Sequence, residues 1–472
     1  MTTPVGTTTY HYDSLTGRLD QITSPEGKAF TYSYNHGQLS SLQYPNGITA
    51  QYAFDDNGNL TDLNYVKGGS SVKRYQYKYD KNGMRDTMID NDGVHAYAYD
   101  AIYQITQATH PTVQNPLEQF TYDAVGNRMT DLTHSAYQYN ELNQLLEDDS
   151  CKYLYDLDGN QTEKIDKNTG DTTAYTYDIE NKLVEVRKAG MLAQYAYDAL
   201  GRRMSKTMNG VAKHYRYNVD NLVLEMNGND SVVADYTFGP GIDNPLEMNR
   251  GGSVYFYVKD GLGSVTALAS ESGNVCHEYA YGVFGKIISE SGDNVENCFT
   301  YTSREFDRET GLMFYRARMY NPQIGRFISE DPIGSEGGIN LYRYSRNCTT
   351  NYIDPDGLDP CCSQGDVSAC VDRCVSCSGG DLALAALGLS ATSAGIIPKV
   401  GRAARVSEAM GGGRLTNLLS LATHFGAPLA LRQIGTLLNP IADATMAFAL
   451  SYYITLRFVT CPVMCKSNCN SF

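Results

Sequence analysis

Cysteine is the residue type whose number and spacing most directly suggest chemistry in this sequence. Eight of the twelve cysteines fall in residues 361–472, and the last three are spaced four residues apart. On a helix that spacing would place all three on one face. An even number in two clusters favours disulfides that join the two ends of this tail in an exported product. The disulfide candidates are Cys361, Cys362, Cys370, Cys374, Cys377, Cys461, Cys465 and Cys469.

A metal site and free thiols remain alternatives for these cysteines. Cys-x3-Cys steps without histidine, however, match no usual zinc spacing. We therefore predict no metal ion and no cofactor.

Two Asp-Pro dipeptides, at Asp331 and Asp354, supply a second possible chemistry. Hydrolysis of an amide by water needs one carboxylate to accept a proton and another carboxyl to donate one. Two close carboxyls cannot both ionise cheaply, so one pKa rises and the pair divides these roles. Asp-Pro and Asp-Pro-x-Gly are also typical of ordinary turns. From the dipeptides alone, the turn interpretation comes first.

The tail shows no nuclease or deaminase pattern. Its one histidine is His424, whereas a zinc deaminase needs a His/Glu/Cys grouping. If the tail is toxic, its apolar and slightly cationic segments favour membrane perturbation. A folded, Cys-stapled cap without activity is the alternative.

Composition indicates the elements that position these groups. The chain has 472 residues, 37 Tyr, no Trp, 44 Gly and 15 Pro. Tyr favours strands because its ring packs on a pleated surface while its hydroxyl stays hydrated. Gly supplies the positive φ angles of tight turns. The composition therefore predicts many strands joined by tight turns.

Charge divides the chain into two regimes. The whole chain carries −15, and residues 361–472 carry +3, which leaves −18 on residues 1–360. Such an acidic surface argues against nucleic-acid binding. In the tail, Leu415, Leu418, Leu419 and Ala422 recur at helical spacing, which predicts a small α-helical domain. We expect no signal peptide and no membrane-spanning helix, because no apolar run reaches the required length.

A repeat of Tyr-x-Tyr-Asp, often followed by Gly three residues later, fills the first half of the chain. Tyrosines two apart share one face of a strand, Asp bonds its own backbone, and Gly accepts a left-handed conformation. Each unit is thus a predicted β-hairpin of about 20 residues, and stacked hairpins stabilise one another. The Asp or Asn positions are 13, 35, 55, 80, 100, 123, 140, 156, 178, 198 and 218.

Exposed tyrosines could instead bind carbohydrate. Packing along the sheet already explains the spacing without a ligand, so we favour a structural role for them. Carbohydrate binding stays an alternative.

Past residue 238 the repeat gives way to a denser series of short motifs. They include Tyr257-Val-Lys-Asp-Gly-Leu-Gly, Tyr301-Thr-Ser-Arg-Glu-Phe-Asp, Gly311-Leu-Met-Phe-Tyr-Arg-Ala-Arg, Tyr320-Asn-Pro-Gln-Ile-Gly-Arg-Phe and Asp354-Pro-Asp-Gly-Leu. In this order they resemble the Rhs-associated core of polymorphic toxins and of the C component of insecticidal Tc toxins. The resemblance, with its YD repeats, covers about residues 8–358.

The resemblance implies a hollow shell whose wall is a spiralling antiparallel sheet. It also implies an intramolecular aspartic autoprotease that cuts between Leu358 and Asp359. The matching acids are Asp331 and Asp354, and Arg326 would lie near them, where it could stabilise an oxyanion or hold one acid ionised. A tethered scissile bond has a high effective concentration, so a single turnover suffices.

These interpretations together predict three parts: a YD-repeat array in 1–238, an Rhs-associated core in 239–358 and a variable Cys-rich helical tail in 359–472. We expect a secreted or cell-surface shell that releases its tail for toxin delivery. Its predicted partners are further YD-repeat wall or an upstream chain, and an immunity protein for the tail. A membrane is a possible partner of the tail only, and nucleic acid is not expected. The alternatives are a non-catalytic adhesion or carbohydrate-binding protein and an inactive Rhs remnant.

Overall fold

The structure, a computed structural model, describes residues 1–358, which belong to one compact unit, Met1–Cys361. These residues are mainly antiparallel strands, as predicted, and their helical elements are the short 3-10 turns η1 (Tyr301–Ser303), η2 (Gly334–Gly337) and η3 (Ser345–Asn347). No helix in this part of the chain is long and apolar enough to cross a membrane. The predicted helical tail and its eight cysteines lie outside the described residues.

Two large sheets carry the repeats, and within each sheet the strands lie in chain order, as expected for stacked hairpins. The 11-stranded first sheet consists of β3 (Thr9–Tyr12), β4 (Leu19–Thr23), β5 (Ala29–Asn35), β6 (Gln38–Gln43), β7 (Thr49–Phe54), β8 (Leu60–Lys67), β9 (Ser70–Tyr79), β10 (Arg85–Ile89), β11 (Val94–Tyr99), β12 (Ile105–Thr109) and β13 (Leu117–Gln119).

The 16-stranded second sheet runs without interruption past residue 238, so strand pairing does not mark the change of sequence pattern there. It consists of β16 (Gln138–Tyr139), β17 (Leu145–Glu147), β18 (Cys151–Tyr155), β19 (Gln161–Asp166), β20 (Thr172–Tyr177), β21 (Leu183–Lys188), β22 (Met191–Tyr197), β23 (Arg203–Met208), β24 (Val211–Asn218), β25 (Asn221–Asn227), β26 (Val232–Phe238), β27 (Pro245–Arg250), β28 (Ser253–Lys259), β29 (Val265–Ser270), β30 (Val275–Tyr281) and β31 (Ile287–Gly292).

The wall is interrupted between these two sheets, whereas a single sheet was expected. A separate pair, β14 (Thr121–Tyr122) and β15 (Arg128–Thr130), lies between β13 and β16 along the chain, and β1 (Thr2–Thr3) pairs with β2 (Gly6–Thr7) before the first sheet. Strands near the interruption have only two or three residues. Pro111 and Pro116, which cannot donate a backbone hydrogen bond, lie in the loop before β13. Pairing there is too short to continue the ladder.

The Asp of each repeat unit builds its turn as predicted. In the turn after β18, the Asp156 carboxylate accepts the backbone N–H groups of Asp158 and Asn160 at 3.0 and 2.8 Å, and Gly159 has φ +77°. A carboxylate that captures two backbone donors fixes the turn without help from distant residues. The same side-chain pattern recurs at Asp55, Asp80, Asp100, Asp123, Asn140, Asp178 and Asp198.

The second tyrosine of a unit does more than pack. Its hydroxyl donates to a backbone carbonyl of an earlier strand instead of staying hydrated, and this bond ties one hairpin to the one before it. The bonds join Tyr34 to Leu19, Tyr79 to Leu60, Tyr122 to Ile105, Tyr139 to Arg128, Tyr177 to Gln161 and Tyr197 to Leu183, at 2.7 to 3.0 Å.

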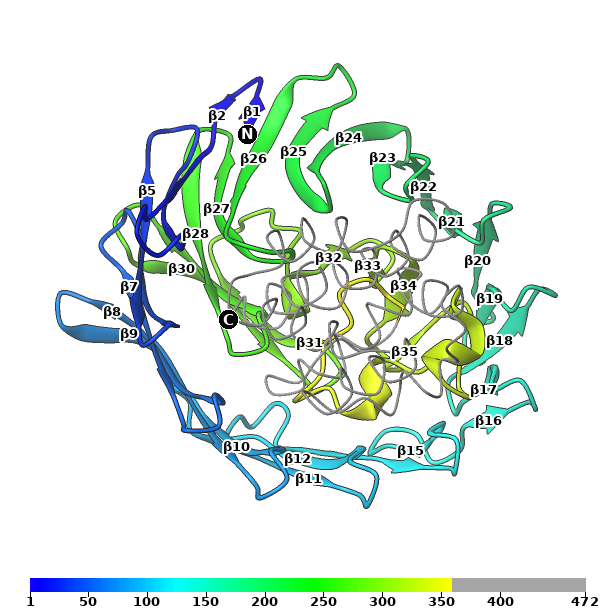
Figure 1. The fold of residues 1–472 in the computed structure, drawn as a ribbon. Coiled ribbons are helices and arrows are strands. Elements are labelled where there is room, and N and C mark those ends of the chain that lie inside the picture. Colours follow the sequence, from blue (N-terminus) through cyan, green and yellow to red (C-terminus); the bar gives the residue numbers. More distant parts are fainter. Residues whose placement is uncertain (359–472) are drawn as a thin grey trace, which may run out of the picture. The chain divides into compact units, whose positions relative to one another are not determined.

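The wall curves until its late strands pack on its early ones (Figure 1). Residues of β27–β29 share one hydrophobic core with residues of β4–β9. In this overlap the rings of Phe30 and Phe256 lie 6.0 Å apart, and the Tyr65 hydroxyl donates to the Lys259 carbonyl at 3.0 Å. The wall therefore spirals past its own beginning and is two layers thick there.

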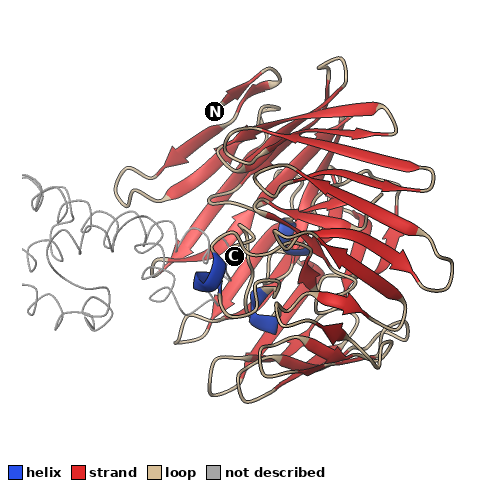
Figure 2. Ribbon diagram, turned by 90° about the vertical axis from the view of Figure 1, so that its right-hand side faces the viewer, coloured by secondary structure: helices blue, strands red, loops and turns tan. Residues whose placement is uncertain are grey.

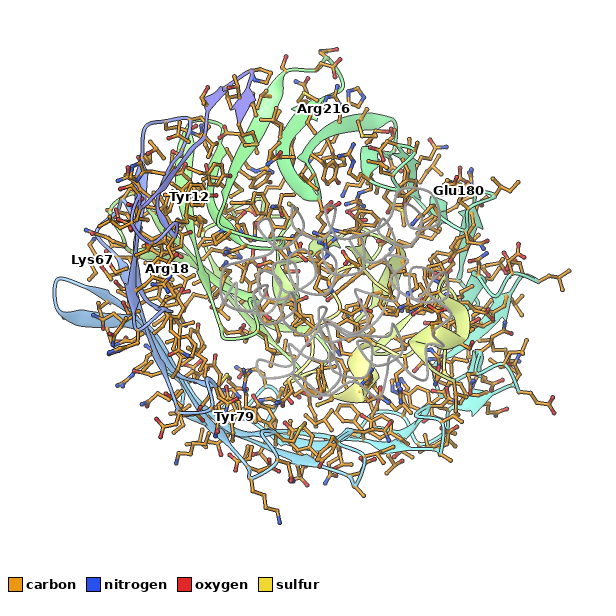
Figure 3. All side chains as sticks on the ribbon, viewed as in Figure 1. Tyr12, Arg18, Lys67, Tyr79, Glu180 and Arg216 are labelled. Atoms are coloured by element: carbon orange, nitrogen blue, oxygen red, sulfur yellow. The ribbon has the colours of Figure 1, made fainter. Side chains whose placement is uncertain are left out.

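Residues 293–358, here called the cap segment, lie inside the curve of the wall (Figure 1), and side chains project from both faces of the wall (Figure 3). The cap segment contains the sheet β32 (Glu305–Asp307), β33 (Leu312–Tyr315), β34 (Arg318–Asn321) and β35 (Arg326–Phe327). Phe314 and Met319 of this sheet pack against Val186 and Tyr195 of the wall.

The turns that follow the Tyr-x-Tyr strands gather at one edge of the sheets, because alternate antiparallel strands point the same way; Figure 2 shows the strands and their hairpin ends from the side. We call these turns the collar. The cap segment bonds to five of the collar turns. Asn351 donates to the Gly83 carbonyl, Asn347 to that of Gly126, Tyr342 to that of Gly159 and Arg316 to that of Asp220, while Lys182 of the collar donates to the Ala317 carbonyl of the cap.

Candidate functional site

The β33–β34 hairpin is the element that organises the predicted acid pair. Its two-residue turn holds Arg316 and Ala317, and Arg316 adopts φ +53°. Tight hairpin turns need such left-handed residues. The turn brings Arg318, the first residue of β34, to the end of the cap segment.

Arg318 contacts both predicted acids. Its Nη2 lies 2.7 Å from Asp331 Oδ2 and 3.6 Å from Asp354 Oδ2. Because both carboxyls contact the same nitrogen, they lie within a few ångströms of each other. All three side chains are at most 5% exposed. The structure thus unites two residues that the sequence separates by 23 positions.

Asp354 has the chemistry of an acid held neutral. Burial raises its pKa to about 7, although Arg318 and the N–H of Leu358 act in the opposite direction. Its Oδ1 accepts that N–H at 3.0 Å, while its Oδ2 is buried without a hydrogen-bond partner. A carboxyl of this kind can donate a proton near neutral pH.

The backbone before the predicted cut is held on three consecutive carbonyls by three consecutive residues. Arg316 Nη1 donates to Pro355 O at 2.5 Å, the Ala317 N–H to Asp356 O at 3.0 Å, and Arg318 Nε to Gly357 O at 2.5 Å. Together with the bond from Leu358 to Asp354, this clamp fixes every residue from 354 to 358. Such fixing brings a scissile bond and its catalytic groups into lasting proximity.

Gly357 is required by this clamp. It has φ +67°, and a Cβ at this position would lie 2.3 Å from the Tyr315 carbonyl oxygen. A side chain would therefore push the backbone away from the hairpin, and the Gly of the Asp-Pro-x-Gly motif serves close approach as well as the turn.

Arg326 is held elsewhere, so the arginine beside the acids is Arg318. The Arg326 guanidinium donates to the Asn143 carbonyl of the collar at 2.5 Å and lies 5.0 Å from the rings of Tyr139 and Tyr342. This position indicates that Arg326 joins the cap segment to the collar. The sequence Arg316-Ala317-Arg318, at the tight turn between β33 and β34, could have indicated Arg318 as the arginine beside the acids.

A cavity of about 230 Å³ adjoins Leu358. Three collar turns and the cap segment form it. Burial lowers the pKa of Lys182, whose ammonium donates to the carbonyl oxygens of Arg316 and Ala317. The lining residues are Lys182, Leu200, Gly201, Arg202, Tyr217, Asp220, Arg304, Glu305, Phe314, Arg316, Ala317, Asp356 and Leu358.

The cysteines and metal ligands of the described part add no second centre. Cys151, Cys276, Cys298 and Cys348 are free thiols, and within residues 1–358 no three His, Cys, Asp or Glu side chains are grouped to hold a metal ion. The disulfide candidates of the tail stay predictions.

Comparison with known proteins identifies relatives of this chain. The family model "Teneurin YD-shell" matches residues 86–349. The tRNA3(Ser)-specific nuclease WapA of Bacillus spizizenii is 32% identical over 372 residues, which cover 75% of this chain and 16% of that protein. Double-stranded DNA deaminase toxin A of Burkholderia cenocepacia is 27% identical over 388 residues, 69% of this chain and 27% of the toxin. The chain thus spans less than a third of either relative.

Among solved structures, the TcdB2-TccC3-Cdc42 crystal structure matches 74% of this chain and 20% of that one, with a TM-score of 0.60 and 19% identity. At this identity the likeness concerns the fold alone. It agrees with the resemblance inferred from the motifs.

Proposed function

Because the chain belongs to the teneurin YD-shell family, we propose that residues 1–358 form shell wall and that the cap segment cuts its own chain between Leu358 and Asp359. The tail is released by this cut and is delivered as an effector. The relatives named as a nuclease and as a deaminase toxin support a role in toxin delivery.

One observation carries the proposal: Arg318 contacts Asp331 and Asp354 while Asp354 also binds the N–H of Leu358. A structural ion pair needs neither a second buried carboxyl nor a clamped backbone beside it. Two carboxyls of unequal character beside a fixed peptide are the requirements for acid–base hydrolysis.

In the proposed reaction the two acids divide the work. The ion pair with Arg318 favours ionised Asp331, which removes a proton from water as the water oxygen bonds to the Leu358 carbonyl carbon. Asp354, protonated on Oδ2, gives its proton to the Asp359 nitrogen as the C–N bond breaks. The products are a carboxylate at Leu358 and a free amine at Asp359.

The chain covers a small share of its relatives, and this favours a larger assembly. The structural match is to the TcdB2-TccC3-Cdc42 crystal structure, in which TcdB2 accompanies TccC3. We therefore propose that further YD-repeat wall, on the same or another chain, completes the shell, and that export to the cell surface or medium precedes delivery. An immunity protein for the tail fits this scheme.

A denaturing gel of the purified chain tests the cut. We expect two fragments, residues 1–358 and 359–472, in place of one 52.0 kDa band, and sequencing of the smaller fragment should begin at Asp359. Asp331→Asn should restore the full-length band. The matched control, Asp158→Asn in an exposed collar turn, should be cut like the parent.

A non-catalytic surface protein is the second candidate, favoured by the match to a teneurin domain. An intact band in the parent chain after long incubation at pH 5 to 8 would support it and would contradict self-cleavage.

A further inference from the structure

Away from the cap acids, four titratable side chains form a continuous chain at the end of the first sheet. Asp90 Oδ2 lies 3.1 Å from His95 Nε2, and His95 Nδ1 lies 2.8 Å from His110 Nδ1. His110 Nε2 lies 2.9 Å from Glu118 Oε1. The two imidazoles are 12% and 3% exposed, so water does not replace these bonds easily.

These four hydrogen-bonded side chains connect the two large sheets. Glu118 belongs to β13, where the first sheet ends, and its Oε1 also accepts the N–H of Val283, in the turn after β30, at 3.0 Å. A Cβ at Gly282 would lie 3.0 Å from Glu118 Oε2, so the turn approaches the carboxylate closely. Because His110 and Val283 bond to the same carboxylate oxygen, the hydrogen bonds of the histidines affect the contact between Glu118 and Val283, which are 165 positions apart.

The number of hydrogens on the two imidazole rings follows from the four groups that they join. A carboxylate only accepts, so each Nε2 must carry a hydrogen to bond Asp90 or Glu118. The contact between the two Nδ1 atoms needs one more hydrogen, because two bare nitrogens repel and two N–H groups cannot bond each other. Three hydrogens on two rings mean one neutral imidazole and one imidazolium. The complete network exists only with a single net positive charge on the pair.

The surrounding charges are consistent with that count. Burial raises the pKa of Asp90, but the hydrogen bond and charge of His95 and nearby N–H groups outweigh it, so the pKa is lowered and Asp90 is ionised. A cavity of about 100 Å³ adjoins both rings. Lys73, which faces it from β9, is paired with Glu278 at 2.6 Å. The other charged or titratable groups facing the cavity are Arg85, Asp92, Asp260, Tyr75, Tyr97, Tyr279, Tyr281 and Tyr301.

We propose that His95 and His110 share one proton and form a pH-sensitive latch between the end of the first sheet and the turn after β30. Acidification adds a second proton and places two imidazolium N–H groups face to face. Alkalinisation removes the shared proton and leaves one of the three bonds unmade. The latch is complete only where the pair holds one shared proton, so it weakens when a proton is added and when one is removed.

Hydrogen exchange at the Val283 amide in the full chain measures the latch. After correction for the intrinsic pH dependence of exchange, we expect protection to pass through a maximum at an intermediate pH and to fall about tenfold or more on either side of it. His110→Gln should flatten this profile, because an amide donates and accepts regardless of pH. The control His214→Gln, which removes an exposed pair with Asp230, should leave it unchanged. A flat parent profile, or a His110→Gln profile like the parent's, would overturn the proposal.

A second variant separates proton sharing from packing. Glu118→Gln keeps an oxygen to accept the Val283 N–H but removes the charge that stabilises the imidazolium, so the alkaline limb should shift down by about one pH unit. An unshifted limb means that the residue only packs, and it contradicts the latch. The same measurements with EDTA should match those without it. A change on chelation would show that a metal ion, and not a proton, joins the two Nδ1 atoms.

Discussion

Two buried charge clusters involve the four-stranded sheet of the cap, and they differ in how many cations contact each aspartate. Asp307 on β32 is bonded by two cations, Arg203 at 2.5 Å and Lys206 at 2.9 Å. In the second cluster, Asp331 and Asp354 share Arg318.

The two clusters give opposite pKa shifts to equally buried acids. Burial raises the pKa of Asp307, but Arg203 and Lys206 outweigh it, and the net shift is downward. For Asp354 burial outweighs Arg318, and the pKa rises to about 7. The first cluster fastens the cap sheet to β23 of the wall, whereas the second keeps one acid ready to donate a proton. The number of cations in contact with the aspartate, more than its burial, therefore decides whether its pKa falls, as in the structural ion pair of Asp307, or rises, as in the candidate active site.

The largest expected effect concerns cleavage. Asp354→Asn should slow the appearance of the 1–358 fragment by about 10² to 10⁴-fold, since it removes the proton donor. Asp307→Asn should leave the rate in the folded fraction nearly unchanged. Timed gels after initiation of synthesis measure both rates. Equal losses in the two variants would erase the distinction between the clusters.

Stability should show the reverse order. In residues 1–358, the fragment that remains after cleavage, Asp307→Asn should cost about 2–3 kcal/mol, because Arg203 and Lys206 each lose one of two carboxylate partners. Asp354→Asn, measured on residues 1–358 so that Asp331 still pairs with Arg318, should raise stability at pH 8, where the parent must bury an ionised carboxylate. Denaturant melts followed by tyrosine fluorescence test both signs. A loss in both variants would mean that Asp354 is also a tether.

The pH dependence sharpens the comparison. Cleavage should fall about tenfold per pH unit above about pH 7, as Asp354 loses its proton. The folded pKa of Asp354 is above its usual value, so the stability it contributes is complete below about pH 4 and is lost as pH rises to about 7. Asp307, with a lowered pKa, contributes stability that is lost as the solution is acidified. Melting midpoints across pH 3–9 should give difference curves of opposite slope for the two variants.

The smallest effect concerns the clamp beside the second cluster. Gly357→Ala should slow cleavage about tenfold or more, because its Cβ would displace the backbone from Tyr315. Gly170→Ala is the matched control, since Gly170 has φ +75° with no atom near its Cβ. Both variants should cost about 1–2 kcal/mol of stability for the left-handed conformation. Cleavage as fast in the Gly357 variant as in the control would remove the clamp from the mechanism.

Local chemistry explains how much of the fold could be predicted. The Asp156 carboxylate and Gly159 act within five residues, so a hairpin could be inferred from a single unit. The bond from the Tyr197 hydroxyl to the Leu183 carbonyl joins separate strands, and spacing alone does not reveal it. The break near β14 depends on how far short strands can pair, and no repeat pattern encodes that.

The candidate site was predictable in its acids but not in its arginine. Asp331 and Asp354 stand in recognisable motifs. Arg318 and Arg326 both stand in such motifs too, and only the β33–β34 hairpin decides which one reaches the acids. That decision rests on contacts between distant segments, such as Arg316 with Asp220 of the collar.

The bonds between the collar and the cap segment also limit how many hairpins the wall can have between them. Between Gly83 and Asp220 several collar turns bond to the cap segment, so the cap fits a fixed number of hairpins in that interval. If a hairpin were inserted or deleted there, Arg316 could no longer reach the Asp220 carbonyl, and the clamp would move away from Leu358. A hairpin added before Gly83 would leave these anchors in place but would shift the contacts of β4–β9 with β27–β29, so the overlap of the wall constrains its length there.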